Sequence, residues 1–364
     1  MDIQDQEAPL STNHIHFHKP KGMECGIIRP SNYNLTLGKE LGAEQNNVKG
    51  RRSYSSFHCF SFEEIVDFTN NFDEGNLIGV GSYGKVYHGI LLDGIQVVVK
   101  ELFLSSVKAE EFRSMMEAIP NITHKNLVKM IGYCVKDWQP YARYILVSEY
   151  VDNGNLHHWL HEDEVGDISI PLSWRTRMNI ISGIAKGLAY MHEDVDPKMV
   201  HGRLQSCKVL LDRHWNPKIS EFAVGRVLGL KRRLFTDAGY MASEYAMAGE
   251  MDEKSDVYSF GILVMEIISG RKPIDHDRPK EEIQLVEWLK LMVSIQNYKQ
   301  ILDPRITQVP PLKELKRVLL IALRCVDLTP ENRPKMGQVI HMLQPNDLLL
   351  SDVSNKKCQV FCFQ

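Results

Sequence analysis

The sequence predicts an α+β protein with two lobes: a small lobe built on a mostly antiparallel sheet with one main helix, and a larger helical lobe. Two observations predict this fold class. Short segments of strand-like composition, separated by turn signals, occur between residues 76 and 149, and apolar residues recur with helical spacing from residue 156 onward. We therefore divide the chain into a disordered tail (1–60), a sheet lobe (61–148), a helical lobe (149–345) and a second tail (346–364).

A short helix is expected to open the sheet lobe. The apolar residues at 62, 65, 66 and 68 share one helix face, and Ser61 and Glu64 are placed as a capping box. Asp93-Gly94 is a strong hairpin signal between two strand-like segments. The main helix of this lobe is expected at about 107–119. The expected strands are residues 76–80, 85–90, 95–100, 127–134 and 143–149.

The helical lobe is predicted from a series of apolar and amphipathic segments. Residues 256–268 are apolar almost all round, which indicates a helix buried in a core; the segment is too short to span a bilayer. The expected helices are residues 174–192, 256–268, 311–324 and 335–343.

Composition excludes two classes of partner. The net charge is −3, so the chain offers no excess of positive charge for binding nucleic acid. The sequence contains no run of 18 apolar residues, so we expect no transmembrane segment.

The tails each carry a feature with two interpretations. His14, His16 and His18 alternate, which is typical of a solvated tail, and a metal site is the alternative. Cys358 and Cys362 follow two lysines, so acylation is the alternative to a frayed tail.

A glycine-rich segment between two expected strands is the first candidate site. Gly79, Gly81, Gly84 and Val86 form a Gly-x-Gly-x-x-Gly-x-Val pattern. Alone the pattern is weak, because a tight hairpin also uses glycine. Lys100 ends the next strand, and this combination favours a loop that covers phosphate groups.

From about residue 60 to 350 the chain resembles the plant receptor-like kinases, within the Ser/Thr protein kinase superfamily. The resemblance implies the bilobal eukaryotic protein kinase fold. The sequence shows neither a transmembrane span nor an ectodomain, so it is similar to the receptor-like cytoplasmic kinases. We therefore expect a cytoplasmic location, with peripheral recruitment to the inner face of the plasma membrane. The segments that carry the resemblance are residues 124–128, 131–134, 152–156, 187–192, 254–261 and 333–336.

The resemblance also implies a nucleotide site. Lys100 matches the lysine that holds the α- and β-phosphates, but Met115 stands where its glutamate partner is expected, and Glu111, one turn earlier, is the candidate substitute. Val98 adds methyl groups where the family has alanine, and Ser148 replaces the usual tyrosine at the rear of the cleft. The residues at matching positions are Gly79, Gly81, Gly84, Val86, Val98, Lys100, Ser148, Glu149, Val151 and Leu210.

The segment 200–212 resembles the catalytic loop His-Arg-Asp-x-Lys-x-x-Asn but departs from it at the residues that do chemistry. Arg203 replaces the base aspartate, Gln205 the loop lysine and Lys208 the metal-binding asparagine. Further on, Glu221 and Ala223 stand for the first and last residues of Asp-Phe-Gly. A guanidinium cannot accept a proton at neutral pH, so we expect no functional catalytic residue.

Metal binding is expected to be lost as well. Magnesium requires oxygen ligands, whereas Lys208 supplies a cation, which leaves at best Glu221. Two interpretations remain open: the cations take the place of magnesium and hold ATP weakly or without metal, or the site is empty.

The activation segment is altered, but two structural contacts of the family are expected to survive. Gly202 replaces the arginine that binds a phosphorylated loop, and Asp237 replaces the substrate-facing threonine. The resemblance implies that Glu244 pairs with Arg333 and that Asp256 holds the backbone near His201.

These features predict a pseudokinase that acts as a scaffold or allosteric partner of an active receptor-like kinase or other signalling protein. The alternatives are an atypical or weakly active Ser/Thr kinase and a metal-independent ATP-binding sensor.

Overall fold

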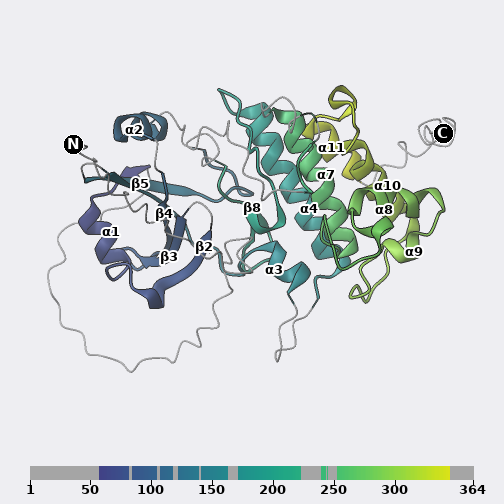
Figure 1. The fold of residues 1–364 in the computed structure, drawn as a ribbon, viewed down its shortest axis with the longest axis horizontal. Helices are drawn as coiled ribbons and strands as arrows, with labels where there is room; N and C mark the ends of the chain where they lie inside the picture. The colour runs from purple at the N-terminus through teal and green to yellow at the C-terminus, as the bar shows by residue number, and fades with distance from the viewer. Residues whose placement is uncertain are drawn as a thin grey trace, which may run out of the picture.

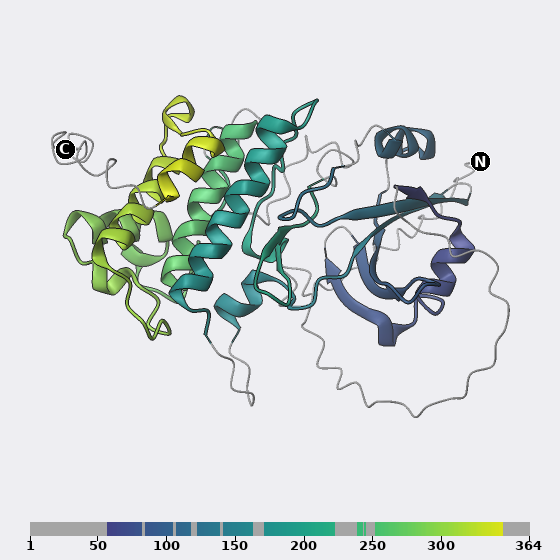
Figure 2. The same ribbon diagram turned by 180° about the vertical axis from the view of Figure 1, so that it is seen from behind.

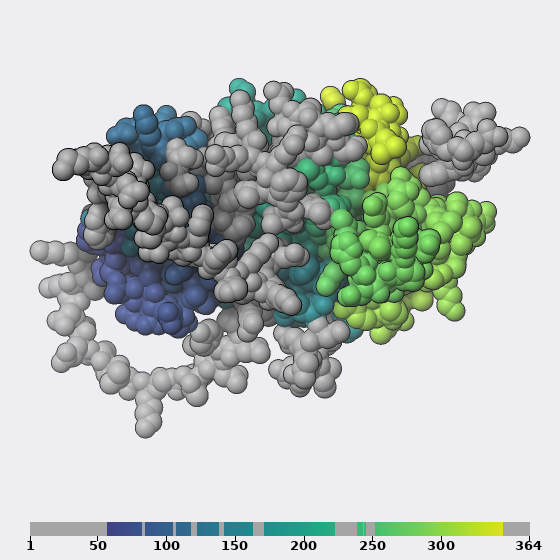
Figure 3. Space-filling model, in the orientation of Figure 1, coloured from purple at the N-terminus to yellow at the C-terminus, as the bar shows by residue number. Residues whose placement is uncertain are grey.

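The computed structural model describes residues 57–81, 84–104, 107–117, 122–138, 141–162, 171–222, 239–242, 244 and 252–344. They form two lobes, which lie at opposite ends of the molecule in the ribbon view (Figure 1) and in the space-filling view (Figure 3). This arrangement confirms the predicted fold class. Most of both predicted tails lies outside the described residues, including His14, His16, His18, Cys358 and Cys362, and so do Ala223 and Asp237.

A six-stranded sheet of order β1-β5-β6-β4-β3-β2 forms the smaller lobe. All neighbours pair antiparallel except β1 and β5, which are parallel. The predicted hairpin joins β3 to β4, where the amide of Leu91 donates to the carbonyl of Ile95 (2.9 Å) and Gly94 has a φ of 84°. The strands are β1 (His58–Cys59), β2 (Leu77–Gly81), β3 (Gly84–Ile90), β4 (Gln96–Leu102), β5 (Met130–Trp138) and β6 (Tyr141–Glu149).

The sheet begins earlier than the sequence predicted. Residues 57–60, which we assigned to the tail, contain β1, and the side chain of Phe60 is only 3% exposed. Gly132 permits this pairing, because a Cβ there would lie 2.0 Å from the carbonyl oxygen of His58. The strand is two residues long, too short to give a period-2 pattern in the sequence.

Two helices accompany the sheet. Helix α1 (Phe62–Phe68) carries the predicted capping box, with both the Ser61 and the Glu64 side chains bonded to backbone amides. Its Ile65 and Phe68 are buried in a cluster with Phe60 and strand residues. Helix α2 (Ala109–Glu117) contacts β5.

The helical lobe is built around α7 (Glu253–Ser269), whose side chains are buried almost all round, as predicted. Helices α4 (Trp174–Ala189), α8 (Leu285–Ser294) and α10 (Leu312–Cys325) contact it, and the long helices run side by side (Figure 2). The remaining helices are α3 (Leu156–His161), α9 (Tyr298–Ile301) and α11 (Met336–Leu343). Among the described residues, no helix combines the length and hydropathy needed to cross a bilayer.

A small hairpin lies between the lobes and positions the candidate site. Strands β7 (Val209–Leu211) and β8 (Pro217–Ile219) pair antiparallel, with Val209 opposite Ile219. The amide of Ser220 donates to the carbonyl of Lys208 (2.8 Å), which extends the pairing by one step. Lys208 is therefore brought next to Glu221.

Candidate functional site

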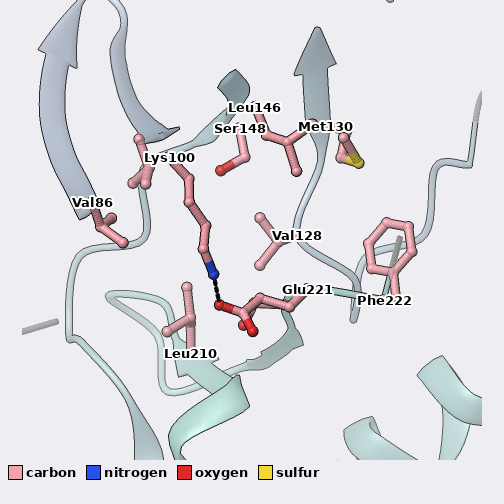
Figure 4. A pocket seen from close by; sticks show the side chains of 11 residues that line it. Val86, Lys100, Val128, Met130, Leu146, Ser148, Leu210, Glu221 and Phe222 are labelled. Atoms are coloured by element: carbon pink, nitrogen blue, oxygen red, sulfur yellow. Dashed lines mark hydrogen bonds and ion pairs between the residues drawn. The ribbon is translucent and has the colours of Figure 1, made fainter. Parts of the chain in front are cut away.

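A cleft lies between the sheet lobe and the β7–β8 hairpin (Figure 4). Five of the predicted nucleotide-site residues line it: Val86, Val98, Lys100, Ser148 and Leu210. Glu221, the expected remaining metal ligand, also lines the cleft. The other lining residues were not predicted from the sequence to belong to the site: Val128, Met130, Leu146, Ser220 and Phe222. Most are apolar residues on strands or beside them, and their apolar character alone does not distinguish a cleft wall from the core.

An ion network fills the polar end of the cleft. The Nζ of Lys100 binds Oε1 of Glu221, and the Nζ of Lys208 lies 2.6 Å from Oε2 of the same carboxylate (Figure 4 shows the first contact). One carboxylate thus lies between two ammonium groups. All three side chains are at most 21% exposed, so solvent screens these contacts only partly.

Electrostatics keep this carboxylate ionised. Burial alone would raise the pKa of Glu221, but Lys100 and Lys208 outweigh it and hold the pKa far below its ordinary range. Burial lowers the pKa of the Lys100 ammonium, and the nearby positive charges of Lys208 and Arg203 act in the same direction, while Glu221 opposes them. The network is therefore anionic at one position and cationic at two, with the positive charge of Arg203 nearby.

Lys100 pairs with neither of the two helix positions considered for its partner, the usual position at Met115 and the candidate substitute Glu111. Met115 is partly buried against the main apolar core, consistent with its apolar character, and the exposed Glu111 forms no ion pair with Lys100 in the described part of the chain. Glu221 takes the role of partner. No local sequence pattern indicates this contact, because residues 100 and 221 meet only through the fold.

The catalytic-loop segment keeps its scaffold. The two carboxylate oxygens of Asp256 accept hydrogen bonds from the amides of His201 and Gly202, each at 2.7 Å, which confirms the contact expected there. Burial lowers the pKa of His201. The neutral ring accepts from the amide of Arg203 at Nδ1 (3.1 Å) and donates from Nε2 to the carbonyl of Ser220 (2.9 Å).

Asp212, the only carboxylate within the described segment 200–212, does not take the place of the base. Asp212 accepts hydrogen bonds from the amides of His214 and Asn216, both at 2.8 Å, and from the Asn216 side chain at 3.0 Å. Burial raises its pKa, but these bonds outweigh that effect and lower it. Asp212 therefore supports the turn between β7 and β8. Gln205, itself a residue of the catalytic loop, is buried.

The three glycines of the glycine-rich segment and two other predicted positions are not among the described residues that line the cleft. A Cβ on Gly84 would lie 1.8 Å from the carbonyl oxygen of Glu101, so the β3–β4 pairing by itself requires glycine there. Gly79 and Gly81 lie on β2.

Glu149 ends β6 and Val151 lies two residues beyond it, and both have structural contacts of their own. The carboxylate of Glu149 accepts from the Lys129 amide and the Lys218 ammonium, both at 2.8 Å. Val151 is buried with Val128 and Leu210.

The second expected structural pair is also present. Arg333 donates from both terminal nitrogens to the two carboxylate oxygens of Glu244, at 2.5 and 3.0 Å. The guanidinium is fully buried, so this bidentate pair fixes the end of the activation segment to the helical lobe.

The architecture and the site define a protein of the kinase class. A family model described as protein tyrosine and serine/threonine kinase matches residues 72–343, so the chain belongs to this family. Within the family it is a member of the plant receptor-like kinases. A probable receptor-like serine/threonine-protein kinase of Arabidopsis thaliana is 47% identical over 294 residues, which cover 79% of this chain and 66% of that protein.

Other relatives support the same assignment. The proline-rich receptor-like protein kinase PERK8 of Arabidopsis thaliana is 34% identical over 83% of this chain and 44% of its own length. The chain thus spans just under two thirds of the length of the first relative and less than half of the length of the second. Among solved structures, the pseudokinase domain of BIR2, an immune regulator of the RLK/Pelle family, matches with a TM-score of 0.64 and 27% identity, over 81% of this chain and 87% of that one.

Proposed function

We propose that this protein is a pseudokinase: it keeps the kinase scaffold, does not transfer phosphate, and acts by binding an active receptor-like kinase or another signalling protein. The observation that carries the proposal is the ion network in the cleft. Glu221, at the position of a magnesium ligand, has one carboxylate oxygen bound to Lys100 and the other to Lys208.

Magnesium would have to displace an ammonium group to reach this carboxylate. A divalent cation needs several oxygen ligands near 2.1 Å, and the asparagine position that should supply one carries Lys208 instead. The metal would therefore meet a cation at one ligand position and a neutralised carboxylate at the other. Loss of the metal removes the main stabilisation of the transferring phosphoryl group.

The proton of an attacking hydroxyl also lacks an acceptor. Arg203 stays protonated at all physiological pH values, and Asp212 is engaged with the β7–β8 turn. General base assistance is typically worth about 10²–10⁴-fold in rate. The loss of both the metal site and the base supports a protein that functions by binding other proteins and not by catalysis.

Preservation of the scaffold supports a binding role. The contacts of Asp256 with the catalytic loop and of Glu244 with Arg333 maintain the fold without serving chemistry in this chain. The matched BIR2 domain is described as a pseudokinase of an immune regulator, which is the kind of role proposed here. We place this role in the cytoplasm, at the inner face of the plasma membrane.

A second function is favoured by the same cations. Lys100 and Lys208 offer two ammonium groups at the polar end of a cleft whose walls are largely apolar, and this supports weak, metal-independent binding of ATP. In that role the nucleotide acts as a signal and is not consumed.

Transfer of labelled γ-phosphate tests the main proposal. The full chain is incubated with labelled ATP and magnesium, alone and with a general protein substrate, beside a Lys100→Ala variant. We expect equal background labelling in both proteins. Labelling of the unaltered chain that the Lys100→Ala variant lacks would establish the alternative, an atypical or weakly active Ser/Thr kinase.

The binding role is tested with the purified kinase domain of an active receptor-like kinase. We expect a complex by analytical ultracentrifugation, and we expect the Lys100→Ala variant to form it equally well. Absence of a complex with a panel of such domains would contradict this choice of partner.

A further inference from the structure

A second polar cluster lies in the helical lobe, away from the ion network of the cleft. It consists of His157 and His161 on α3, Ser206 in the catalytic loop, Tyr240 at the end of the activation segment and Glu266 on α7. Residues 157 and 161 are four apart on one helix, so their side chains lie on the same face. Their rings are 4.7 Å apart, centre to centre.

Glu266 is a buried carboxylate that neither lysine nor arginine neutralises in the described part of the chain. Its side chain is fully buried. Oε1 accepts from His161 Nε2 (2.7 Å) and from the Ser206 hydroxyl (2.8 Å), and Oε2 accepts from the Tyr240 hydroxyl. Buried charges in proteins are either paired or bind metal ions, and the described contacts of this carboxylate come from one imidazole and two hydroxyl groups.

The second imidazole completes a set of three metal ligands. Nδ1 of His157 lies 3.2 Å from the Ser206 hydroxyl, and the donor atoms of His157, His161 and Glu266 all lie within 4.8 Å of one another.

We propose that His157, His161 and Glu266 bind a zinc-class divalent metal ion. Two imidazoles and one carboxylate suit zinc, whereas magnesium and calcium prefer oxygen ligands alone. Zinc bonds of about 2.0–2.2 Å bring neighbouring ligand atoms to roughly 3.5 Å in a tetrahedral site, and rotation of the half-buried His157 side chain closes the set. A water molecule takes the fourth position.

The hydroxyls of Ser206 and Tyr240 orient the ligands. Their bonds to Glu266 hold the carboxylate in place, as outer partners do in known metal sites. The ion would connect α3 and α7 to the catalytic loop and to the end of the activation segment. Its role is therefore structural: the ion stabilises the packing of the catalytic loop and the end of the activation segment against α3 and α7.

Metal titration of the full chain tests this site. His14, His16 and His18 are first replaced by alanine, because the tail histidines are an independent candidate for metal binding. After chelator treatment and removal of the chelator, the protein is titrated with Co²⁺, whose visible absorption reports tetrahedral coordination, and with Zn²⁺ by calorimetry. We expect one saturating equivalent and an increase in melting temperature.

A matched pair of variants assigns the ligands. In the same background, His157→Gln should weaken binding by at least about 10–100-fold, because even outer partners contribute that much. His276→Gln, at an exposed histidine, should leave it unchanged. Absence of saturable binding in the tail-substituted chain, or equal affinity of the two variants, would overturn the proposal, and neither result depends on the pseudokinase assignment.

Discussion

Replacing Lys208 with methionine keeps most of the length of the side chain and removes its charge, so it tests the ion network directly. The ammonium lies 2.6 Å from Glu221, with the two side chains 15% and 21% exposed. A hydrogen bond to a charged group contributes about 1.5–3 kcal/mol. Because Glu221 keeps Lys100 as a partner, we expect Lys208→Met to lower the free energy of unfolding by about 2 kcal/mol.

The complementary variant should cost more. Glu221→Gln leaves Lys100 and Lys208 as two neighbouring buried ammonium groups without a counter-charge, and breaking a buried pair in this way costs about 3–5 kcal/mol. In the Glu221→Gln background, Lys208→Met removes a repulsion and should be neutral or stabilising. The two changes therefore should not add, and we expect a coupling of at least about 2 kcal/mol.

Thermal and urea unfolding of the two single variants and the double variant measure this coupling. For a domain of this size about 2 kcal/mol corresponds to a fall of roughly 3 °C in melting temperature. The matched control is Lys198→Met, because Lys198 is 64% exposed and lies 3.5 Å from Glu253, so it should change stability by less than about 0.5 kcal/mol. Additive effects of the two cleft variants, within about 0.5 kcal/mol, would refute the network.

Three further predictions concern the scaffold. Burial lowers the pKa of His201, so this pKa is lower in the folded than in the unfolded protein. The stability contributed by the neutral ring is therefore complete above about pH 6.5 and should fall by up to roughly 1.4 kcal/mol per pH unit below it. Urea unfolding at pH 7.5 and 5.5 measures this fall, and equal stability at the two pH values would contradict the buried neutral ring. Glu244→Gln removes the negative charge opposite the buried Arg333 and turns one of its two acceptor oxygens into a donor, so it should destabilise the fold by about 3 kcal/mol. An unchanged urea midpoint would show that the pair does not hold this segment. Gly132→Ala places a Cβ against the carbonyl of His58 and should release β1, seen as faster amide exchange in residues 57–60, and unaltered protection there would contradict the close approach.

Most of the fold could be predicted because its signals are local. The capping box at Ser61, the Asp93-Gly94 hairpin and the apolar helix α7 each depend on residues near one another in sequence, and the structure has all three. The two-residue β1 was missed, since its pairing depends on Gly132, more than 70 residues later.

The site was only partly predictable. The replacement of chemical residues at Arg203 and Lys208 is visible in the sequence, because residue type alone decides whether a group can accept a proton or bind magnesium. The pairing of Lys208 with Glu221 is not, because the β7–β8 pairing brings them together. The sequence shows that Lys208 supplies a cation where magnesium needs an oxygen ligand. The structure adds that Lys208 also pairs with Glu221, the remaining metal ligand.

The measurement that tests the central claim most directly is thermal unfolding of the full chain with ATP, once with excess magnesium and once with a chelator. If Lys208 occupies the magnesium position, ATP shifts the melting temperature equally in both conditions, or in neither. A shift that appears only when magnesium is added would show that the metal reaches Glu221 past both lysines, and would contradict the account.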